Sequence, residues 1–591
     1  MEAVVRVRVV VPAQSDLNGA ADLSRRTAFL WVFLATAIGA AFRFYGLGWG
    51  APYFHFHIDE HIVFTYADAL ARDSREAANS AKFFMYSPFP MYLLNGIVAV
   101  YTAVSHPLDL TLPRDEVTYM LLGRSISATL GSATIPLTYA TTRLVAGRRA
   151  GVLAAFLLAG AVIHLRESHF FSLDVSMTFF TVLGLYSATR LATRGDTAAQ
   201  AGSAVALGLG LASKYSAAFL APLIAIAELL SPRAPQRLTP FEPARWLRVA
   251  VRAAITIAAG VAIFLMLDWL VIRYFDKFRD DIKVWVIDPL SGATKPEWIA
   301  QFADVNAIPY WFTNLLWWGL GPALEIAGLA GIVWLLAVRR DRAAIVAGVF
   351  PILYWVSAGK TATVAPFIRY TVPLAAPMAV AAGVLCADLI AQSRWRRVAL
   401  ATTAVVIGST LLWAAAYMNV FRQPDSRLVA SQWLVDNVKA GAKILIEPSH
   451  NTPPTGSYLT NVDFNRNYVL FYPQTEKRDY YQLFALDTYR SLYNRGVDDN
   501  FRRNYIQSRL ALADWIVMDD TFLQQYQHLP EPDHAVVKQY YRDLFAGKLG
   551  FKLVKTFKVY PSLFGVDIDD DAAELTFRSF DHPRVFIFMR Q

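Results

Sequence analysis

The most regular feature of the chain is a series of apolar stretches of roughly 17–25 residues, the length that a helix needs to cross a bilayer. They lie at about 27–46, 117–142, 150–166, 173–193, 201–213, 215–230, 247–272, 313–338, 342–358, 369–391 and 398–418. Apolar stretches this long predict helices that are apolar on all sides. The pattern therefore indicates a mainly α-helical, polytopic membrane protein.

One further apolar stretch, 90–104, needs a decision, and the basic residues decide it. They cluster at Arg25-Arg26, Arg143 with Arg148-Arg149, Arg190 with Arg194, Arg233 to Arg248, Arg339-Arg340 with Arg342, and Arg394 to Arg397. Lys and Arg concentrate in short cytoplasmic loops. All six clusters share one side only if 90–104 does not span the membrane. We therefore expect 90–104 to be a juxtamembrane helix, with eleven spans, the N-terminus cytoplasmic and the C-terminus outside.

Composition agrees with a membrane protein. Charged residues make up 17% of the 591 residues and the mean hydropathy is +0.33, whereas a soluble chain is about 25% charged. The net charge of +9 is spread over the basic clusters, which sets topology and argues against a nucleic-acid surface. The single cysteine, Cys386, excludes an intramolecular disulfide and a Cys-based metal site.

Three parts of the chain follow from these patterns. Residues 1–26 are expected to be a cytoplasmic segment, and 27–420 the membrane domain. From about 421 the composition becomes that of a soluble domain, with a helical stretch near 431–438 and short strand-like stretches at 443–447, 513–518 and 585–589. Strands that alternate with helices predict a small α/β domain, 421–591, on the outer face.

The first candidate site lies in the long outer loop, 47–116. It contains the adjacent carboxylates Asp59 and Glu60, flanked by His57 and His61. These acids can simply cap a helix that begins near His61, because acids favour a helix N-terminus. They can also supply a general base at the membrane surface. The two roles are compatible.

A second group of candidates follows the third expected span, on the same outer side: Arg166, His169 and Asp174. Asp174 begins an apolar helix, where a helix-start acid is the plain interpretation. Asp59, His169 and Asp174 are together candidate ligands for a divalent cation, since carboxylate and imidazole suit several metals. Their spacing is not a metal signature, so we assign no cofactor with certainty.

Lys and Arg concentrate on the cytoplasmic side, so basic residues expected on the outer side are candidates for a functional role. Lys214 interrupts an apolar stretch, as expected where two short helices meet at the outer face; its plain role is snorkelling to headgroups. Lys360, Arg369 and Tyr370 lie near the outer end of another span. A lipid phosphate is the natural partner of these groups.

Taken in order, these residues resemble the glycosyltransferases with the GT-C fold that use polyprenyl- or dolichyl-phosphate sugars, including the protein O-mannosyltransferases and the bacterial transferases that add aminoarabinose to lipid A. The resemblance covers about 27–420. It rests on Asp59-Glu60, Pro88 and Pro90, Arg124, the Arg166, His169 and Asp174 series, Lys214-Tyr215, and Arg369-Tyr370 with Pro373 and Pro377. In the lipid A branch a Glu-Lys pair precedes the prolines, whereas here Lys82 lies several residues earlier, which leaves the acceptor open.

The resemblance implies an inverting transfer of one sugar from a lipid monophosphate to a hydroxyl acceptor, at the outer face of a bacterial inner membrane. Asp59 would be the general base, with Glu60 positioning Asp59 or an arginine. Lys214, Arg369, Tyr370 and Lys360 would bind the donor phosphate. Asp174, with Arg166, His169, Arg124 and His57 in support, would orient the site. The acceptor would be a lipid, a glycan or a protein.

Two other functions are compatible with the same residues. A transporter or flippase of lipid-linked sugars would more often show internal symmetry and ionisable residues near mid-membrane, and here the polar residues gather at one face. A non-catalytic subunit of an assembly complex would leave Asp59 replaceable. Sugar transfer by an Asp59→Asn variant separates these functions from the transferase.

Overall fold

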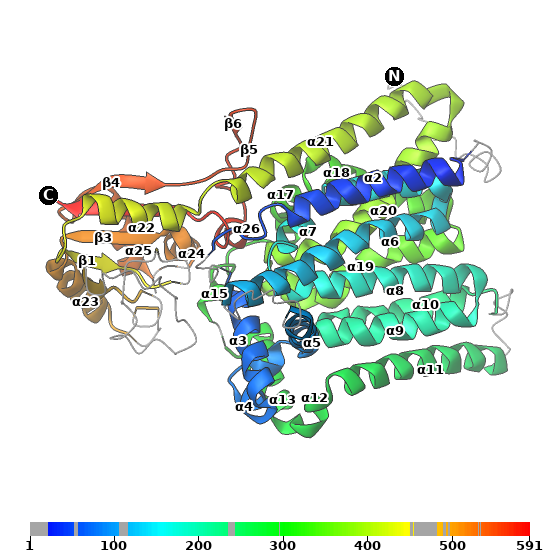
Figure 1. Ribbon diagram of the computed structural model, residues 1–591, viewed down its shortest axis with the longest axis horizontal. Helices are drawn as coiled ribbons and strands as arrows, with labels where there is room; N and C mark the ends of the chain where they lie inside the picture. The colour runs from blue at the N-terminus through cyan, green and yellow to red at the C-terminus, as the bar shows by residue number, and fades with distance from the viewer. Residues whose placement is uncertain are drawn as a thin grey trace, which may run out of the picture.

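The computed structural model describes residues 22–51, 57–105, 116–233, 243–294, 296–449, 453, 481–488, 492–493, 497–529, 531 and 534–591. The expected cytoplasmic segment 1–26 therefore lies almost wholly outside the described residues. Figure 1 shows two parts: a bundle of long, roughly aligned helices, and a smaller domain with a sheet at one end of it.

The bundle and its juxtamembrane elements run from α2 to α21. In chain order they are α2 (Arg25–Phe44), α3 (Ile58–Arg72), α4 (Ser74–Asn79), η1 (Phe83–Met85), α5 (Phe89–Ser105), α6 (Glu116–Ala159), α7 (Val162–Glu167), α8 (Leu173–Arg194), α9 (Thr197–Ser213), η2 (Tyr215–Phe219), α10 (Leu220–Leu230), α11 (Pro243–Leu267), α12 (Trp269–Arg273), α13 (Phe275–Ile282), η3 (Lys283–Ile287), α14 (Asp288–Ser291), α15 (Glu297–Ala300), α16 (Ala307–Tyr310), η4 (Trp311–Leu316), α17 (Trp317–Leu320), α18 (Pro322–Trp334), η5 (Leu335–Arg339), α19 (Arg342–Val364), η6 (Ile368–Leu374), α20 (Ala375–Ala391), η7 (Ser393–Trp395) and α21 (Arg396–Arg422).

Each of the eleven expected spans coincides with helical residues. Within the described residues, five helices are long and apolar enough to cross a membrane: Arg25–Phe44, Trp246–Leu267, Pro322–Arg339, Ile368–Ala391 and the start of Arg396–Asn437. The chain is thus a multi-pass membrane protein, and the number eleven stays a prediction. The element α6 covers the expected span 117–142 and the first part of 150–166, and the non-helical backbone of Ala146 and Gly147 divides it into two helices at a kink. Gly147 has φ of +84°, which a residue with a side chain rarely adopts.

The stretch 90–104 forms a separate helix, α5, and its juxtamembrane position stays a prediction. Figure 1 shows α5 nearly end-on, whereas the long helices of the bundle run along the picture. It packs against α3 and α6 at the end of the bundle that faces the smaller domain. Its 17 residues therefore do not run parallel to the long helices.

The smaller domain contains a mixed five-stranded sheet. Its elements are α22 (Ser426–Asn437), β1 (Lys443–Ile446), β2 (Gln482–Ala485), α23 (Asp499–Leu512), β3 (Trp515–Asp519), α24 (Asp520–His528), α25 (Ala535–Phe545), β4 (Phe551–Phe557), β5 (Ser562–Leu563), β6 (Val566–Asp567), α26 (Leu575–Arg578) and β7 (Val585–Arg590). The strand order is β2-β1-β3-β7-β4; β1 pairs in parallel with β2 and β3, and β7 pairs antiparallel with β3 and β4. The expected helix and three strands are confirmed.

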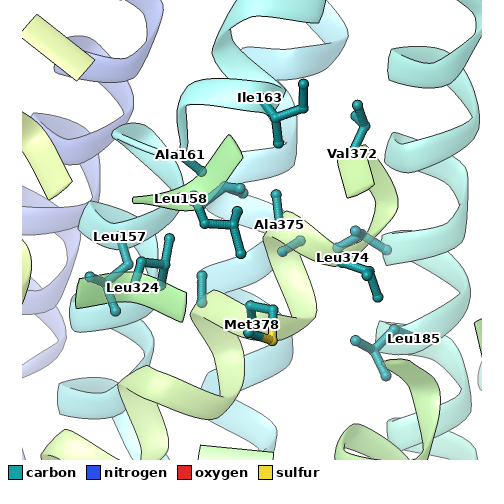
Figure 2. Packing of buried hydrophobic residues seen from close by; sticks show 14 of the residues in the cluster. Leu157, Leu158, Ala161, Ile163, Leu185, Leu324, Val372, Leu374, Ala375 and Met378 are labelled. Atoms are coloured by element: carbon teal, nitrogen blue, oxygen red, sulfur yellow. The ribbon is translucent and has the colours of Figure 1, made fainter. Parts of the chain in front are cut away.

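The element η6 contributes to the main hydrophobic core of the bundle. Val372 and Leu374 of η6 and Met378 of α20 belong to the same buried cluster as Leu158 of α6 and Leu185 of α8, as the close view in Figure 2 shows. These side chains are buried. Within lipid, helices associate through close van der Waals packing, since lipid tails are as apolar as the side chains. A tightly packed η6 gives the residues that it carries a fixed position.

Candidate active site

Asp59 lies in the first turn of α3 and contacts a cation from a distant part of the chain. Its Oδ2 accepts a hydrogen bond from Nη1 of Arg369, 310 residues away, and its Oδ1 accepts one from the Tyr86 hydroxyl at 2.9 Å. The side chains of Asp59 and Arg369 remain 21% and 20% exposed. Two donors therefore fix the carboxylate, which remains partly exposed.

Glu60 has a different environment from its neighbour. Its side chain is fully buried, and Arg124 of α6 binds it with two hydrogen bonds of 2.8 Å. The backbone N–H of Phe171 donates to the same carboxylate at 2.9 Å. Arg124 also donates to the carbonyls of Leu47 and Trp49 at 2.9 and 2.8 Å. Glu60 therefore fastens α3 to α6 through Arg124, and to the turn before α8 through the Phe171 N–H.

The expected helix start near His61 is wrong by three residues. The helix α3 begins at Ile58, and the Nδ1 of His57 caps it by accepting the N–H of Glu60 at 3.2 Å. An imidazole acceptor takes the place of the expected carboxylates because it points back over the first turn. Burial, then the charge of Arg166, lowers the pKa of His57 well below its ordinary value, which keeps the ring a neutral acceptor.

Asp174 and Lys214 form a second ion pair. The Nζ of Lys214 donates to Oδ1 of Asp174 at 2.7 Å. As expected, Lys214 falls at a break, between the end of α9 and the start of η2. Asp174 begins α8, whose cap is the Ser172 hydroxyl. The lysine side chain is 27% exposed and the aspartate 8%, so the lysine is the member of the pair that an incoming anion can reach.

Tyr370 joins the two ion pairs. The Nζ of Lys214 lies 5.5 Å from the centre of its ring, and the guanidinium carbon of Arg369 lies 5.6 Å from it. The Tyr354 hydroxyl donates to the Tyr370 carbonyl at 2.7 Å and holds η6 against α19. Asp59, Arg369, Tyr370, Lys214 and Asp174, predicted from separate stretches of the sequence, therefore form one cluster.

Arg166 and His169 lie beside this cluster in buried positions. Arg166 is bound by Glu167 at 2.5 Å and by Asp581 of the smaller domain at 3.0 Å. His169 stacks on Phe421 with ring centres 3.9 Å apart, and its two nitrogens lie 3.0 and 2.9 Å from the carbonyls of Leu165 and Tyr45. Both residues support the packing around the site.

The candidate cation site of Asp59, His169 and Asp174 is not formed. Asp59 is bound to Arg369, Asp174 to Lys214, and His169 to backbone carbonyls. Among the described residues, no group of three His, Cys, Asp or Glu side chains could hold a metal ion. Lys360 belongs to the last turns of α19, and its side chain lies outside the described residues.

The sequence did not identify the part that the smaller domain contributes. Around α26, the carboxylate of Asp581 binds Arg166 and the Tyr417 hydroxyl, and the ring of Phe580 lies 4.3 Å from that of His57. The polar residues before the last strand are evident in the sequence, but the bundle residues that Asp581 binds lie more than 150 positions away in the chain. Only the folded chain brings them together.

His582 makes the stability of this junction depend on pH. Burial alone would lower its pKa, but the carboxylates of Asp570 and Asp581, at 2.8 and 2.7 Å, raise it to about 9. A pKa raised on folding stabilises the fold fully below the ordinary value of about 6.5, and this stabilisation is lost as the pH rises through about 9. We expect the melting temperature of the purified full chain to fall between these pH values.

His582→Gln should flatten that fall, because glutamine does not titrate. The measurement is thermal unfolding in detergent between pH 6 and 10. The matched control is His528→Gln, at an exposed position of α24, which should keep the slope. An unchanged slope in His582→Gln would show that the charge of this histidine does not stabilise the junction.

Comparison with known proteins gives one family. Residues 44–276 match the model of the family described as dolichyl-phosphate-mannose-protein mannosyltransferase. This part of the chain carries Asp59, Arg124, Arg166, Asp174 and Lys214, so the resemblance drawn from the sequence is confirmed there. No curated protein matches the chain significantly.

Several solved structures of membrane glycosyltransferases are similar. The oligosaccharyltransferase of Archaeoglobus fulgidus, tethered with an acceptor peptide, has 13% identity and a TM-score of 0.48, covering 93% of this chain and 75% of its own. ArnT from Cupriavidus metallidurans, bound to undecaprenyl phosphate, has 13% identity and a TM-score of 0.44 over 95% and 98%. The S. cerevisiae protein O-mannosyltransferase Pmt1-Pmt2 complex, bound to the sugar donor, has 16% and 0.34 over 46% and 36%. Similarity at this level assigns no substrate.

Proposed function

We propose that this chain is an inverting glycosyltransferase that moves one sugar from a polyprenyl-phosphate donor to a hydroxyl acceptor. The observation that carries the proposal is the cluster at one end of the bundle: the reachable carboxylate of Asp59 lies against Arg369, and Tyr370 joins Arg369 to Lys214. A base beside two cations is the arrangement that transfer from a phosphate leaving group requires.

In the proposed reaction, Asp59 accepts the proton of the acceptor hydroxyl. The hydroxyl oxygen forms the new bond to the anomeric carbon from the side opposite the phosphate, and the bond from that carbon to the phosphate oxygen breaks. The configuration is therefore inverted. Lys214 and Arg369 stabilise the charge that the departing lipid phosphate acquires.

The donors that remain on Arg369 suit a phosphate. Its Nε is buried and has no hydrogen-bond partner among the described residues, and a guanidinium can bind two phosphate oxygens at once. Asp174 keeps Lys214 oriented toward the same region. Lys360, from the outer end of α19, is a further candidate for the phosphate.

The proposed location is a bacterial inner membrane, with the site and the smaller domain outside. Two helices illustrate the orientation: α2 begins at Arg25 and ends near the site, while α8 begins beside the site and ends at Arg194. Cytoplasmic ends rich in Lys and Arg support this orientation. The donor is accordingly used on the outer leaflet.

Lys214→Met should weaken donor binding. A hydrogen bond to a charged group contributes about 1.5–3 kcal/mol, so we expect a roughly 10- to 100-fold higher Kd for polyprenyl phosphate. The measurement is binding of the phosphorylated lipid to purified protein in nanodiscs. Lys283→Met is the control, since this exposed lysine of η3 pairs with Asp288 at the surface. Equal affinity in both variants would remove Lys214 from the donor site.

The test of the function itself is transfer of label from a polyprenyl-phosphate sugar in proteoliposomes. Release of polyprenyl phosphate together with a labelled product would support a transferase. Movement of intact lipid-linked sugar across the bilayer, without release of the phosphate, would instead identify a transporter.

A further inference from the structure

The carboxylate of Glu574, in the smaller domain, accepts hydrogen bonds from backbone N–H groups in the first turns of two helices. Its Oε1 accepts the N–H of Thr576 at 3.0 Å, which caps α26. Its Oε2 accepts the N–H of Ile368 at 3.1 Å. The residue is buried. One carboxylate therefore satisfies backbone donors in both parts of the chain.

The second of these helices carries the phosphate-binding arginine. Ile368 is the first residue of η6, and Arg369 follows it. The first N–H groups of a helix have no partner within the helix, so a partner from outside fixes where the helix begins. Glu574 supplies that partner one residue before the arginine that contacts Asp59.

Asn314 of η4 fixes the same junction from another side. Its Nδ2 donates to the carbonyl of Ala572 at 2.8 Å, and its Oδ1 accepts the N–H of Glu574 at 2.8 Å. The backbone around Glu574 is thus bound to the bundle by two hydrogen bonds, independently of the carboxylate. The carboxylate itself is directed to Ile368 and Thr576 rather than to any charged group of the site.

We propose that Glu574 is a positioning residue that sets the place of Arg369 in the active site through the Ile368 N–H. The inference rests on the proposed function for its kinetic consequence only. It gives the smaller domain a role in the chemistry of the bundle, because removal of this carboxylate frees the start of η6. A displacement of about 1 Å at a positioning group can cost about 100-fold in rate.

The first test is hydrogen exchange of the full-length protein, because it does not depend on any activity. In Glu574→Ala, peptides that contain Ile368 should exchange faster than in the wild type. Glu447→Gln is the matched control: this buried carboxylate of the same domain accepts from the Tyr541 hydroxyl at 2.5 Å. Unchanged exchange around Ile368 in Glu574→Ala would overturn the positioning role.

The second test is kinetic. Glu574→Ala should lower kcat by roughly 10- to 100-fold with a smaller change in KM for the acceptor, and Glu447→Gln should leave both near wild type. A double-mutant cycle with Arg369→Lys separates positioning from general damage. If Glu574 acts through Arg369, Glu574→Ala should cost much less in the Arg369→Lys background. Full additivity would overturn the proposal.

The two proposals fail in different ways. A wild-type protein that transfers no sugar contradicts the proposed function, and the exchange measurement at Ile368 still decides the role of Glu574. A wild type that transfers sugar, with Glu574→Ala equal to it in kcat, contradicts the positioning role and leaves the function in place.

Discussion

Asp59→Asn is expected to lower the rate of sugar transfer by about 10²- to 10⁴-fold, the contribution of a general base. Asparagine keeps the shape of the side chain, and its one oxygen can still accept from either Arg369 or Tyr86, but it cannot take the proton of the acceptor hydroxyl. The measurement is release of labelled product from a polyprenyl-phosphate sugar in proteoliposomes. Donor binding, measured as polyprenyl phosphate affinity, should change far less than kcat.

Asp68→Asn is the matched control for this substitution. Asp68 lies on the same helix, α3, and forms an exposed i,i+4 pair with Arg72 at 2.6 Å. Exposed pairs of this kind contribute about 0–1 kcal/mol, so both stability and transfer should stay near wild type. Undiminished transfer by Asp59→Asn would exclude Asp59 as the base.

The helices were predictable because the signal for each is local. Continuous apolar stretches predicted the long helices of the bundle, whereas short elements such as α3, α4 and α13 were not predicted. The break at Lys214 was predictable for the same reason: a charged side chain within an apolar stretch is costly unless the chain turns there.

The short strands of the smaller domain were harder to predict. The strands β1, β3 and β7 are largely apolar and buried and were recognised, whereas β4 lies at the sheet edge and has exposed pairs, Lys552-Leu553 and Lys555-Thr556, so it shows no strand-like alternation. Its pairing with β7 is decided by the tertiary fold. The strand β2 has four residues, too few for a periodicity.

The roles of the two adjacent carboxylates could not be separated by sequence. Asp59 and Glu60 are neighbours in one helical turn, so every local pattern treats them alike. Their side chains point in different directions on α3: Glu60 inward to Arg124, and Asp59 to the half-open region beside Tyr86 and Arg369. The distinction comes from residues 27 to 310 positions away, which only the folded chain brings together.

Because Glu60 is bound inward to Arg124, we expect its substitution to affect stability, whereas substitution of Asp59 should affect the rate of transfer. Glu60→Gln should destabilise the protein strongly, because it leaves the guanidinium of Arg124, with its side chain 2% exposed, buried without a counter-charge. Breaking a buried ion pair from one side costs about 3–5 kcal/mol. The expected result is a lower melting temperature of the purified full chain and less folded protein recovered from membranes.

The control is again the exposed pair of α3, where Arg72→Gln should shift the melting temperature little. The combination of Glu60→Gln with Arg124→Gln sharpens the test, because the two residues are in direct contact and their effects should not add. A double variant about as stable as Glu60→Gln alone would identify the uncompensated arginine as the cause. If Glu60→Gln kept wild-type stability but lost transfer, as expected of Asp59→Asn, then the assignment of base and anchor to these two carboxylates would have to be reversed.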